Sequence, residues 1–574
     1  METSRNMILA VVLSALVLLG WSLISERYFP TATPPATKFN QQGEQVALPQ
    51  PQADPTADAP AAVRDRRAVL RETPRVVIDT AALAGSINLV GARIDDLVLR
   101  EYPETLAKDS PPIRLLSPAG APASQFASFG WTAPAGVPVP GIATRWTASS
   151  NRLTVEQPVR LSWDNGQGQL FAIDLSVDEH FLFTAKQTVV NRGGRPVTVT
   201  PYGLVSRTGR GSDVGTWINH VGPIGAFEEA ADYGVSYDDV AEAGETGVVP
   251  EGQANWVGFS DKYWASVLVP PAGASARFQP GRAADSFQAA TTAAALAVEP
   301  GAAKSVTSRF FSGAKEVDLL ANYADSGIPR FDLLIDWGWF AVVERPFFWL
   351  LKTIEGAVGN WGLAIILLTI AVRLLMFPIA QRQFASMAAM RRLQPKLKSL
   401  QERHKDNKEK LQKEMMQLYK TEKVNPLAGC LPIVIQIPVF FALYKVLVLV
   451  VELRHQPFAL WIHDLSAPDP ATPLNGFGTF GFTLPNLLAI GILPILVGIT
   501  QYWSFKQNPP PDETQAKIFA FMPWVLMFVM APFAAGLQLY WMTTNLFTVF
   551  QQRIMYARHP ELKNPPKTAP VKVK

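Results

Sequence analysis

The chain has 574 residues, of which 48% are hydrophobic and only 17% are charged, and its formal net charge at pH 7 is +4. The charged fraction is below the ~25% of ordinary soluble proteins, and the small net charge excludes a global affinity for nucleic acid. Its one cysteine, Cys430, excludes a disulfide framework and a cysteine-based metal site within one chain. We expect no metal ion and no cofactor.

The chain begins with an apolar run of 18 residues, 7–24. A cleaved signal peptide would need small residues at its cleavage site, but Trp21 and Glu26 stand there instead. We therefore expect residues 1–29 to form a retained transmembrane anchor with its N-terminus inside. Residues 30–70 are rich in Pro, Ala, Gln and Thr, cannot bury enough apolar surface to fold, and predict a disordered linker.

Residues 71–330 are predicted to form a large all-β sandwich. Short β-branched runs alternate with Gly, Pro and Asn, as in the predicted strand 183–190 and the turn 191–194 that follows it. Residues 178–180, Asp-Glu-His, resemble a small catalytic cluster. A lone histidine among acids in a strand-rich domain is far more often a solvated edge, so we expect no enzyme site here.

Residues 331–356 are apolar but too highly charged to span a membrane. Tryptophans at 337, 339 and 349 suit a membrane–water boundary. We predict an amphipathic helix lying on the periplasmic surface of the membrane. A helix buried in the β domain is the alternative.

Residues 361–380 form a 20-residue apolar run, long enough to cross a hydrocarbon core of ~30 Å, and contain one charge, Arg373. A guanidinium at that depth costs roughly 2.5–3.5 kcal/mol on insertion scales. The predicted spans contain no Asp or Glu, so this arginine requires water or an incoming anion. An arginine that reaches the inner headgroups, or that bonds backbone carbonyls, is the structural alternative.

Residues 382–424 predict a cytoplasmic helical hairpin. Apolar residues recur at helical spacing in both halves, and twelve Lys and Arg against five Asp and Glu give a net charge of +7. Positively charged loops stay in the cytoplasm, so the β domain should lie on the opposite side. Two explanations of these apolar residues are almost equally good: packing of one helix on the other, or binding of a client by adaptable methionines. The four candidate methionines are Met387, Met390, Met415 and Met416.

Four further spans are predicted, at residues 428–451, 484–505, 517–531 and 534–552. The apolar run 518–550 is too long for one span and short for two. Two spans with a turn near Ala531 return the basic tail, residues 553–574, to the cytoplasm. The fold class is therefore a polytopic α-helical membrane protein with six spans and both termini inside.

Polar side chains accompany Arg373 on several of these spans. Some will join helices, but several polar faces around one cation favour a hydrated concavity between the helices. The other members of this predicted groove are Thr369, which lies one turn before Arg373, together with Gln436, Gln501, Tyr540 and Trp541.

Several stretches carry a resemblance to a known family: TIAVRLLMFPIAQRQ, KVNPLAGCLPIVIQIPVFFALYKVL, ELRHQPFALWIHDLS and GLQLYWMTTNLFTVFQQ. Together with the order of spans, they resemble the YidC/Oxa/Alb family of membrane protein insertases. The leading anchor and the β domain are similar to the Gram-negative form, which resides in the cell inner membrane. The resemblance covers nearly the whole chain and is specific from Trp361 onward.

The resemblance implies that Arg373 is the functional arginine of a hydrophilic groove open to the cytoplasm and to lipid, with Thr369 beside it. Trp541 occupies a position where many relatives carry tyrosine, so its contact with a client is through the ring. The β domain would be a mutarotase-like supersandwich without enzyme activity. The implied partners are nascent membrane proteins, the Sec translocon, the lipid bilayer and the ribosome, the last through the hairpin and the basic tail.

Two other classes of protein remain as alternatives. A solute transporter would use Arg373 for an anionic substrate, but the sequence has no internal repeat and no paired acid in its spans. A membrane-tethered carbohydrate enzyme would place its site in the β domain, where no convincing pair of carboxylates is visible.

Overall fold

The computed structural model describes residues 64–211, 220–281, 283, 285–381, 393, 396–397, 399–400, 402–404, 407–422, 431–477, 489–507 and 513–558. The predicted anchor, Met387, Met390 and most of the basic tail lie outside these residues. The chain divides into two compact units, Met1–Asp336 and Trp337–Lys574.

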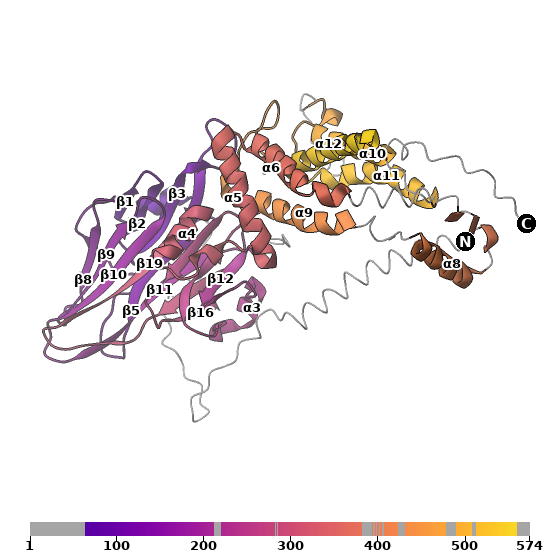
Figure 1. The fold of residues 1–574 in the computed structure, drawn as a ribbon. Helices are drawn as coiled ribbons and strands as arrows, with labels where there is room; N and C mark the ends of the chain where they lie inside the picture. Colours follow the sequence, from indigo (N-terminus) through magenta and orange to yellow (C-terminus); the bar gives the residue numbers. More distant parts are fainter. Residues whose placement is uncertain are drawn as a thin grey trace, which may run out of the picture. The chain divides into compact units, whose positions relative to one another are not determined.

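The first unit contains two large β-sheets (Figure 1). The strands of one sheet are β1 (Arg75–Asp79), β2 (Leu83–Asn88), β3 (Arg93–Pro103), β4 (Pro112–Leu116), β5 (Gln125–Thr132), β7 (Arg152–Leu153), β11 (Val197–Thr208), β16 (Ser275–Pro280), β17 (Ser286–Thr292) and β18 (Leu296–Val298). Within the described residues its order is β16-β17-β11-β5-β3-β2-β1-β7, with β18 beside β11 and β4 beside β3. All of these pairs are antiparallel except β1 with β7.

The strands of the other sheet are β6 (Thr147–Ala148), β8 (Val159–Asp164), β9 (Gln169–Val177), β10 (Leu182–Asn191), β12 (Gly222–Phe227), β13 (Ala230–Asp232), β14 (Ala254–Ser260), β15 (Trp264–Val269) and β19 (Ala303–Ala314). Their order among the described residues is β13-β12-β14-β15-β19-β10-β9-β8-β6. The helices of this unit are α2 (Arg66–Arg71), α3 (Tyr237–Glu242), η1 (Gly244–Thr246), α4 (Val317–Asp325) and η2 (Phe331–Leu334).

The two sheets pack face to face, which confirms the predicted β-sandwich. The ring of Trp131 on β5 meets Phe171 on β9 edge-on, with centroids 5.2 Å apart. Two polar contacts also cross between the sheets, because a buried amide must find a partner. The Nε2 of Gln125 donates to Ser266 Oγ at 2.8 Å, and the Nε2 of Gln187 donates to the Gly130 carbonyl at 2.7 Å. A mutarotase-like topology stays a prediction.

The predicted turn at residues 191–194 carries the chain from one sheet to the other, since β10 and β11 belong to different sheets. Asn191 is fully buried. Its Nδ2 donates to the carbonyls of Arg195 and Val298 at 2.7 and 2.9 Å, and its Oδ1 accepts the Gly193 N–H at 3.0 Å. This one side chain therefore fixes both the turn and the entry into the second sheet.

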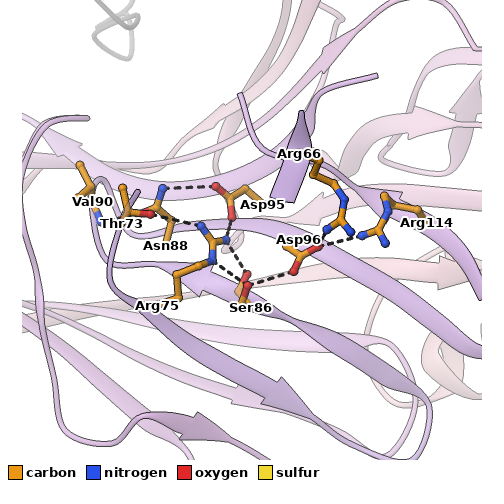
Figure 2. A network of polar contacts seen from close by, with 9 residues as sticks. All are labelled: Arg66, Thr73, Arg75, Ser86, Asn88, Val90, Asp95, Asp96 and Arg114. Carbon is orange, nitrogen blue, oxygen red and sulfur yellow. Dashed lines mark hydrogen bonds and ion pairs between the residues drawn. The ribbon is translucent and has the colours of Figure 1, made fainter. Parts of the chain in front are cut away.

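An ionic network ties α2 to the first sheet (Figure 2). A single oxygen of Asp96 accepts from Arg66 on α2 and from Arg114 on β4, each at 2.8 Å. Next to it, Arg75 pairs with Asp95, whose pKa is raised because its burial outweighs the attraction of Arg75. Residues 66–70 fall in the predicted disordered linker. The structure corrects that prediction there, because these contacts hold the segment as a helix.

The second unit is helical. It contains η3 (Gly338–Phe340), α5 (Ala341–Val358), α6 (Trp361–Leu375), α8 (Lys408–Thr421), α9 (Leu431–Leu449), η5 (Val451–Leu453), η6 (Pro473–Asn475), α10 (Ile492–Gln507), α11 (Glu513–Met530) and α12 (Ala535–Arg558). None of the helices in the described part of the chain combines the length and the apolar character that crossing a membrane requires. The six spans therefore stay a prediction.

Two local signals separate α5 from α6. Gly359 adopts a left-handed conformation with φ 67°, which glycine takes without strain, and ends α5. The Oδ1 of Asn360 then accepts the Leu363 N–H at 2.9 Å and caps α6. At its other end α6 stops at Leu375, and one turn residue, Met376, separates it from the helical residues 377–381, so helical structure continues to the predicted end at 380.

The predicted turn near Ala531 coincides with a non-helical break at residues 531–534, between α11 and α12. Gln538 is fully buried, and its Nε2 donates to the carbonyls of Met530 and Phe533 at 2.9 and 2.8 Å. It thereby satisfies carbonyl groups that the end of α11 leaves without helical partners.

In the region of the predicted hairpin, the structure describes α8 and parts of the arm before it. Asn407 caps α8 by accepting the Lys410 N–H at 3.0 Å. The Nζ of Lys396 in the first arm lies 2.6 Å from the Glu422 carboxylate just after α8. The described residues of the two arms are therefore in contact.

Candidate functional site

The predicted groove residues lie on α6, α9, α10 and α12. Tyr540 on α12 is almost fully buried, and its hydroxyl accepts a short hydrogen bond from Nε2 of Gln436 on α9. Arg373 on α6 lies close enough to Tyr540 for the two side chains to interact electrostatically. Three helices that are far apart in sequence thus bring one cation, one phenol and one amide together.

Trp541, the next residue on α12, makes a second cross-helix contact. Its indole Nε1 donates to Oε1 of Gln501 on α10 at 3.1 Å. The ring of Phe440 on α9 meets the indole edge-on, with centroids 5.2 Å apart and planes at 83°. The indole is thus held on one side by an amide and on another by an aromatic ring. It remains partly exposed, so part of its surface is free for contact.

Thr369 is placed differently from the other five residues. Its side chain is only 2% exposed, and its hydroxyl donates to the Ile365 carbonyl of its own helix at 2.6 Å. The structure places it one turn from Arg373, as the spacing predicts, but the hydrogen bond of its hydroxyl stays within α6. Arg373 itself is half-buried.

One polar contact involves Thr500 on α10, which sequence reasoning missed. Asn545 on α12 donates through Nδ2 to Thr500 Oγ1 on α10 at 3.1 Å, and both side chains are buried. Thr500 directly precedes Gln501, so the pair of adjacent polar residues in an apolar run was the available signal. The Thr500–Asn545 contact joins helices, whereas Gln501 contacts the more exposed Trp541.

Two of the four predicted client-binding methionines are described. Both lie on α8, where Met415 is half-buried and Met416 is 51% exposed. An exposed methionine on a charged helix offers an adaptable apolar contact. Client binding by Met416 stays a prediction. Met387 and Met390 lie outside the described residues.

The hydrogen bonds of Asp178, in the cluster at residues 178–180, have a structural role. Asp178 Oδ1 accepts the N–H groups of His180 and Leu182 at 3.0 and 2.9 Å, and its other oxygen accepts from the Tyr323 hydroxyl. The carboxylate thus shapes the turn before β10. Across the residues that the structure describes, no group of three or more His, Cys, Asp or Glu side chains could hold a metal ion.

Comparison with known proteins gives two family matches. Residues 353–562 match the 60Kd inner membrane protein family, and residues 75–350 match the YidC periplasmic domain. Among solved structures, an active YidC insertase crystal structure is 18% identical, with a TM-score of 0.37, over 85% of this chain and 93% of that one. A galactose mutarotase related enzyme from Lactobacillus acidophilus has a TM-score of 0.27 over 42% of this chain and 97% of that one, at 10% identity. At these TM-scores neither likeness bears on function.

Curated relatives match at much higher identity. Membrane protein insertase YidC of Zymomonas mobilis is 45% identical over 97% of this chain and 95% of the relative. Membrane protein insertase YidC of Beijerinckia indica is 43% identical over 97% of this chain and 96% of the relative. Because this identity extends over both units, the chain belongs to the YidC family of membrane protein insertases.

Proposed function

We propose that this chain inserts nascent membrane proteins into the inner membrane through a hydrophilic groove lined by α6, α9, α10 and α12. The observation that carries the proposal is the convergence of Arg373, Tyr540 and Gln436 from three different helices. Polar groups gathered in this way inside an apolar bundle favour water among them. The groove is proposed to open to the cytoplasm and sideways to lipid.

The mechanism is a difference in solvation rather than a chemical step. A client span with a polar or acidic flank must move that flank across ~30 Å of hydrocarbon. A wet groove shortens the dry part of that path, and the charge of Arg373 attracts an acidic flank. The client then leaves sideways into lipid, driven by burial of its apolar surface at roughly 25 cal/mol per Å².

The proposed topology has six spans, with both termini and the helical hairpin in the cytoplasm and the β domain in the periplasm. The hairpin would receive the emerging client, with Met416 as one apolar contact. The Sec translocon is a proposed partner, and the ribosome another through the hairpin and basic tail. A solute transporter would also explain an intramembrane arginine, but the curated relatives are insertases.

Site-specific photo-crosslinking tests the groove. A photoreactive residue is placed at Arg373 or Trp541, and a stalled nascent membrane protein serves as client. We expect crosslinks from both positions. The matched control is Val342, which is 85% exposed on α5, outside the groove helices. Crosslinks from Val342 but not from the groove positions would refute this route.

A further inference from the structure

We propose that Asp469 is a positioning residue of the groove. It is not itself a groove residue, but lies in the segment 465–471, which we call the shared loop. From there it holds α10 in the place where Gln501 meets the Trp541 indole. This inference rests on the proposed function, in which Trp541 contacts the client. It goes further by assigning the placement of that indole to a buried carboxylate outside the groove.

The shared loop satisfies the first N–H groups of two groove helices. At the start of α10, the Ile492 N–H donates to the Ala471 carbonyl at 3.1 Å. At the start of α12, the Ala535 N–H donates to the Ala467 carbonyl at 2.7 Å, and the next N–H along the helix donates to the Leu465 carbonyl at 2.9 Å. The first N–H groups of a helix have no partner within it. One loop therefore fixes where both helices begin relative to each other.

Asp469 joins the shared loop to α10 through both of its carboxylate oxygens. The residue is only 5% exposed. Its Oδ2 accepts the Leu493 N–H, in the first turn of α10, at 2.6 Å. Its Oδ1 accepts from Trp461 Nε1 and from the Ala471 N–H, each at 3.0 Å. A carboxylate at a helix N-terminus is also favoured by the helix dipole, so this side chain anchors the loop and α10 together.

Gly491 leaves the room for this anchor. It directly precedes α10, and a Cβ atom at this position would lie 2.6 Å from the Cβ of Asp469. Two such atoms do not approach so closely, so a larger residue there would push the carboxylate away from the Leu493 N–H. The start of α10 and the Asp469 side chain are therefore fitted to each other.

The helix carries this placement from its first turn to the groove. Leu493 and Gln501 are eight residues apart in the continuous helix α10, or about 12 Å along its axis. Rigid helices of this kind transmit a displacement from one end to the other. Gln501 accepts from the Trp541 indole at 3.1 Å, and α12, which carries that indole, begins on the same shared loop. The loop therefore positions both partners of this bond.

The test uses the full-length protein in detergent with its tryptophans replaced by fluorotryptophan, so that fluorine NMR reports on each ring. The resonances of Trp461 and Trp541 are assigned by their loss in Trp461→Phe and Trp541→Phe. Gln501→Leu gives the reference position for a Trp541 indole that has lost its acceptor. The test variant is Asp469→Asn. Its amide has the shape of the carboxylate, but its NH2 group donates, so only one of the two acceptor oxygens is replaced.

We expect the Trp541 resonance in Asp469→Asn to shift toward its position in Gln501→Leu. The Trp461 resonance should shift as well, because that indole donates to Asp469 directly. Insertion of a client should fall to the level of Gln501→Leu. A second variant, Gly491→Ala, keeps the carboxylate and only displaces it, and it should shift both resonances in the same directions.

The matched control is Asn360→Ala, which removes the cap of α6 in the same unit. It should lower the temperature of thermal unfolding but leave the Trp541 resonance in place. A shift of Trp541 in this control as large as in Asp469→Asn would overturn the proposal, because any weakening of the helices would then produce it.

A shifted Trp461 resonance beside an unshifted Trp541 resonance would also overturn the proposal, since the Thr500–Asn545 contact would then hold α10 by itself. If Asp469→Asn does not accumulate, Gly491→Ala decides by the same measurement. Normal insertion in both Gln501→Leu and Trp541→Ala would count against the proposed role of Trp541. The two resonances test Asp469 independently of that result.

Discussion

The hydroxyl of Tyr540 and the amide of Gln436 form a hydrogen bond between two helices that are 104 residues apart in sequence. Tyr540 also interacts electrostatically with Arg373 on α6. One phenol therefore connects α9 to the cation on α6.

Removal of either partner should destabilise the second unit. Tyr540→Phe leaves the Gln436 amide without this partner, and Gln436→Leu does the same to a buried hydroxyl, at a cost of about 1–3 kcal/mol each. The double variant leaves neither group unpaired. A double-mutant cycle on thermal unfolding in detergent should therefore show a loss smaller than the sum of the single losses. Additive losses would mean that the two groups are not coupled.

Thiol labelling should distinguish a buried from a partly exposed position among the predicted groove residues. In a Cys430→Ser background, Trp541→Cys should react with a water-soluble maleimide added from the cytoplasmic side, because this position is partly exposed. Thr369→Cys should react several-fold more slowly, because the Thr369 side chain is 2% exposed. The labelling rates of the two variants are compared directly. Faster reaction at position 369 would contradict the placement of Thr369.

Local sequence patterns were enough to predict individual strands and helices. The features that they missed depend on contacts between residues far apart in the sequence. The strand at residues 183–190 was predictable because side chains of a strand alternate between two faces. The passage of the chain from this strand to the other sheet was not predictable, since the bond from Asn191 to the Val298 carbonyl spans 107 residues. The helicity of residues 66–70 likewise depends on Asp96, 30 residues beyond Arg66.

The same limit applies to the candidate site. Spacing alone placed Thr369 one turn from Arg373, because helical periodicity is local. The partners of Tyr540 and Trp541 lie 104 and 40 residues away, on α9 and α10. The sequence identified the polar residues but not which of them pair.

The ionic network around α2 should stabilise the β domain through Asp96. Asp96→Asn removes the charge that Arg66 and Arg114 share, and hydrogen bonds to charged groups contribute about 1.5–3 kcal/mol. We expect a loss of about 2 kcal/mol in the free energy of unfolding of this domain. The control is Glu72→Gln, which breaks the Arg64 ion pair. Both of its side chains are 50% exposed, so the loss should be under about 1 kcal/mol. Equal losses would contradict this account.

The β domain should lose stability in mild acid because of His220. Burial lowers the pKa of this imidazole below its ordinary value of 6.5, although its Nε2 bond to the Pro223 carbonyl, 2.6 Å, opposes the shift. The folded state then binds fewer protons than the unfolded state around and below pH 6.5, so stability falls as pH decreases through that range. His220→Gln should flatten this slope in denaturant titrations at several pH values. An unchanged slope would exclude His220 as its source.

The charge of Arg373 should matter more than its shape. Arg373→Lys keeps the cation and should retain partial insertion, although lysine lacks the planar fork that grips a carboxylate. Arg373→Ala removes the attraction for acidic flanks and also the cost of a charge inside the bundle, so the protein should accumulate normally. Insertion yield is measured for two matched clients, one with an acidic and one with a neutral translocated flank.

In the alanine variant the client with the acidic flank should lose several-fold more insertion than the neutral one, because for the neutral flank the groove supplies mainly water. The Tyr540–Gln436 bond does not involve the arginine, so the helix contacts should survive its replacement. Equal loss for both clients at a normal protein level would assign Arg373 to hydration of the groove rather than to recognition of charge. A fall in protein level would instead show that the arginine holds the helices together.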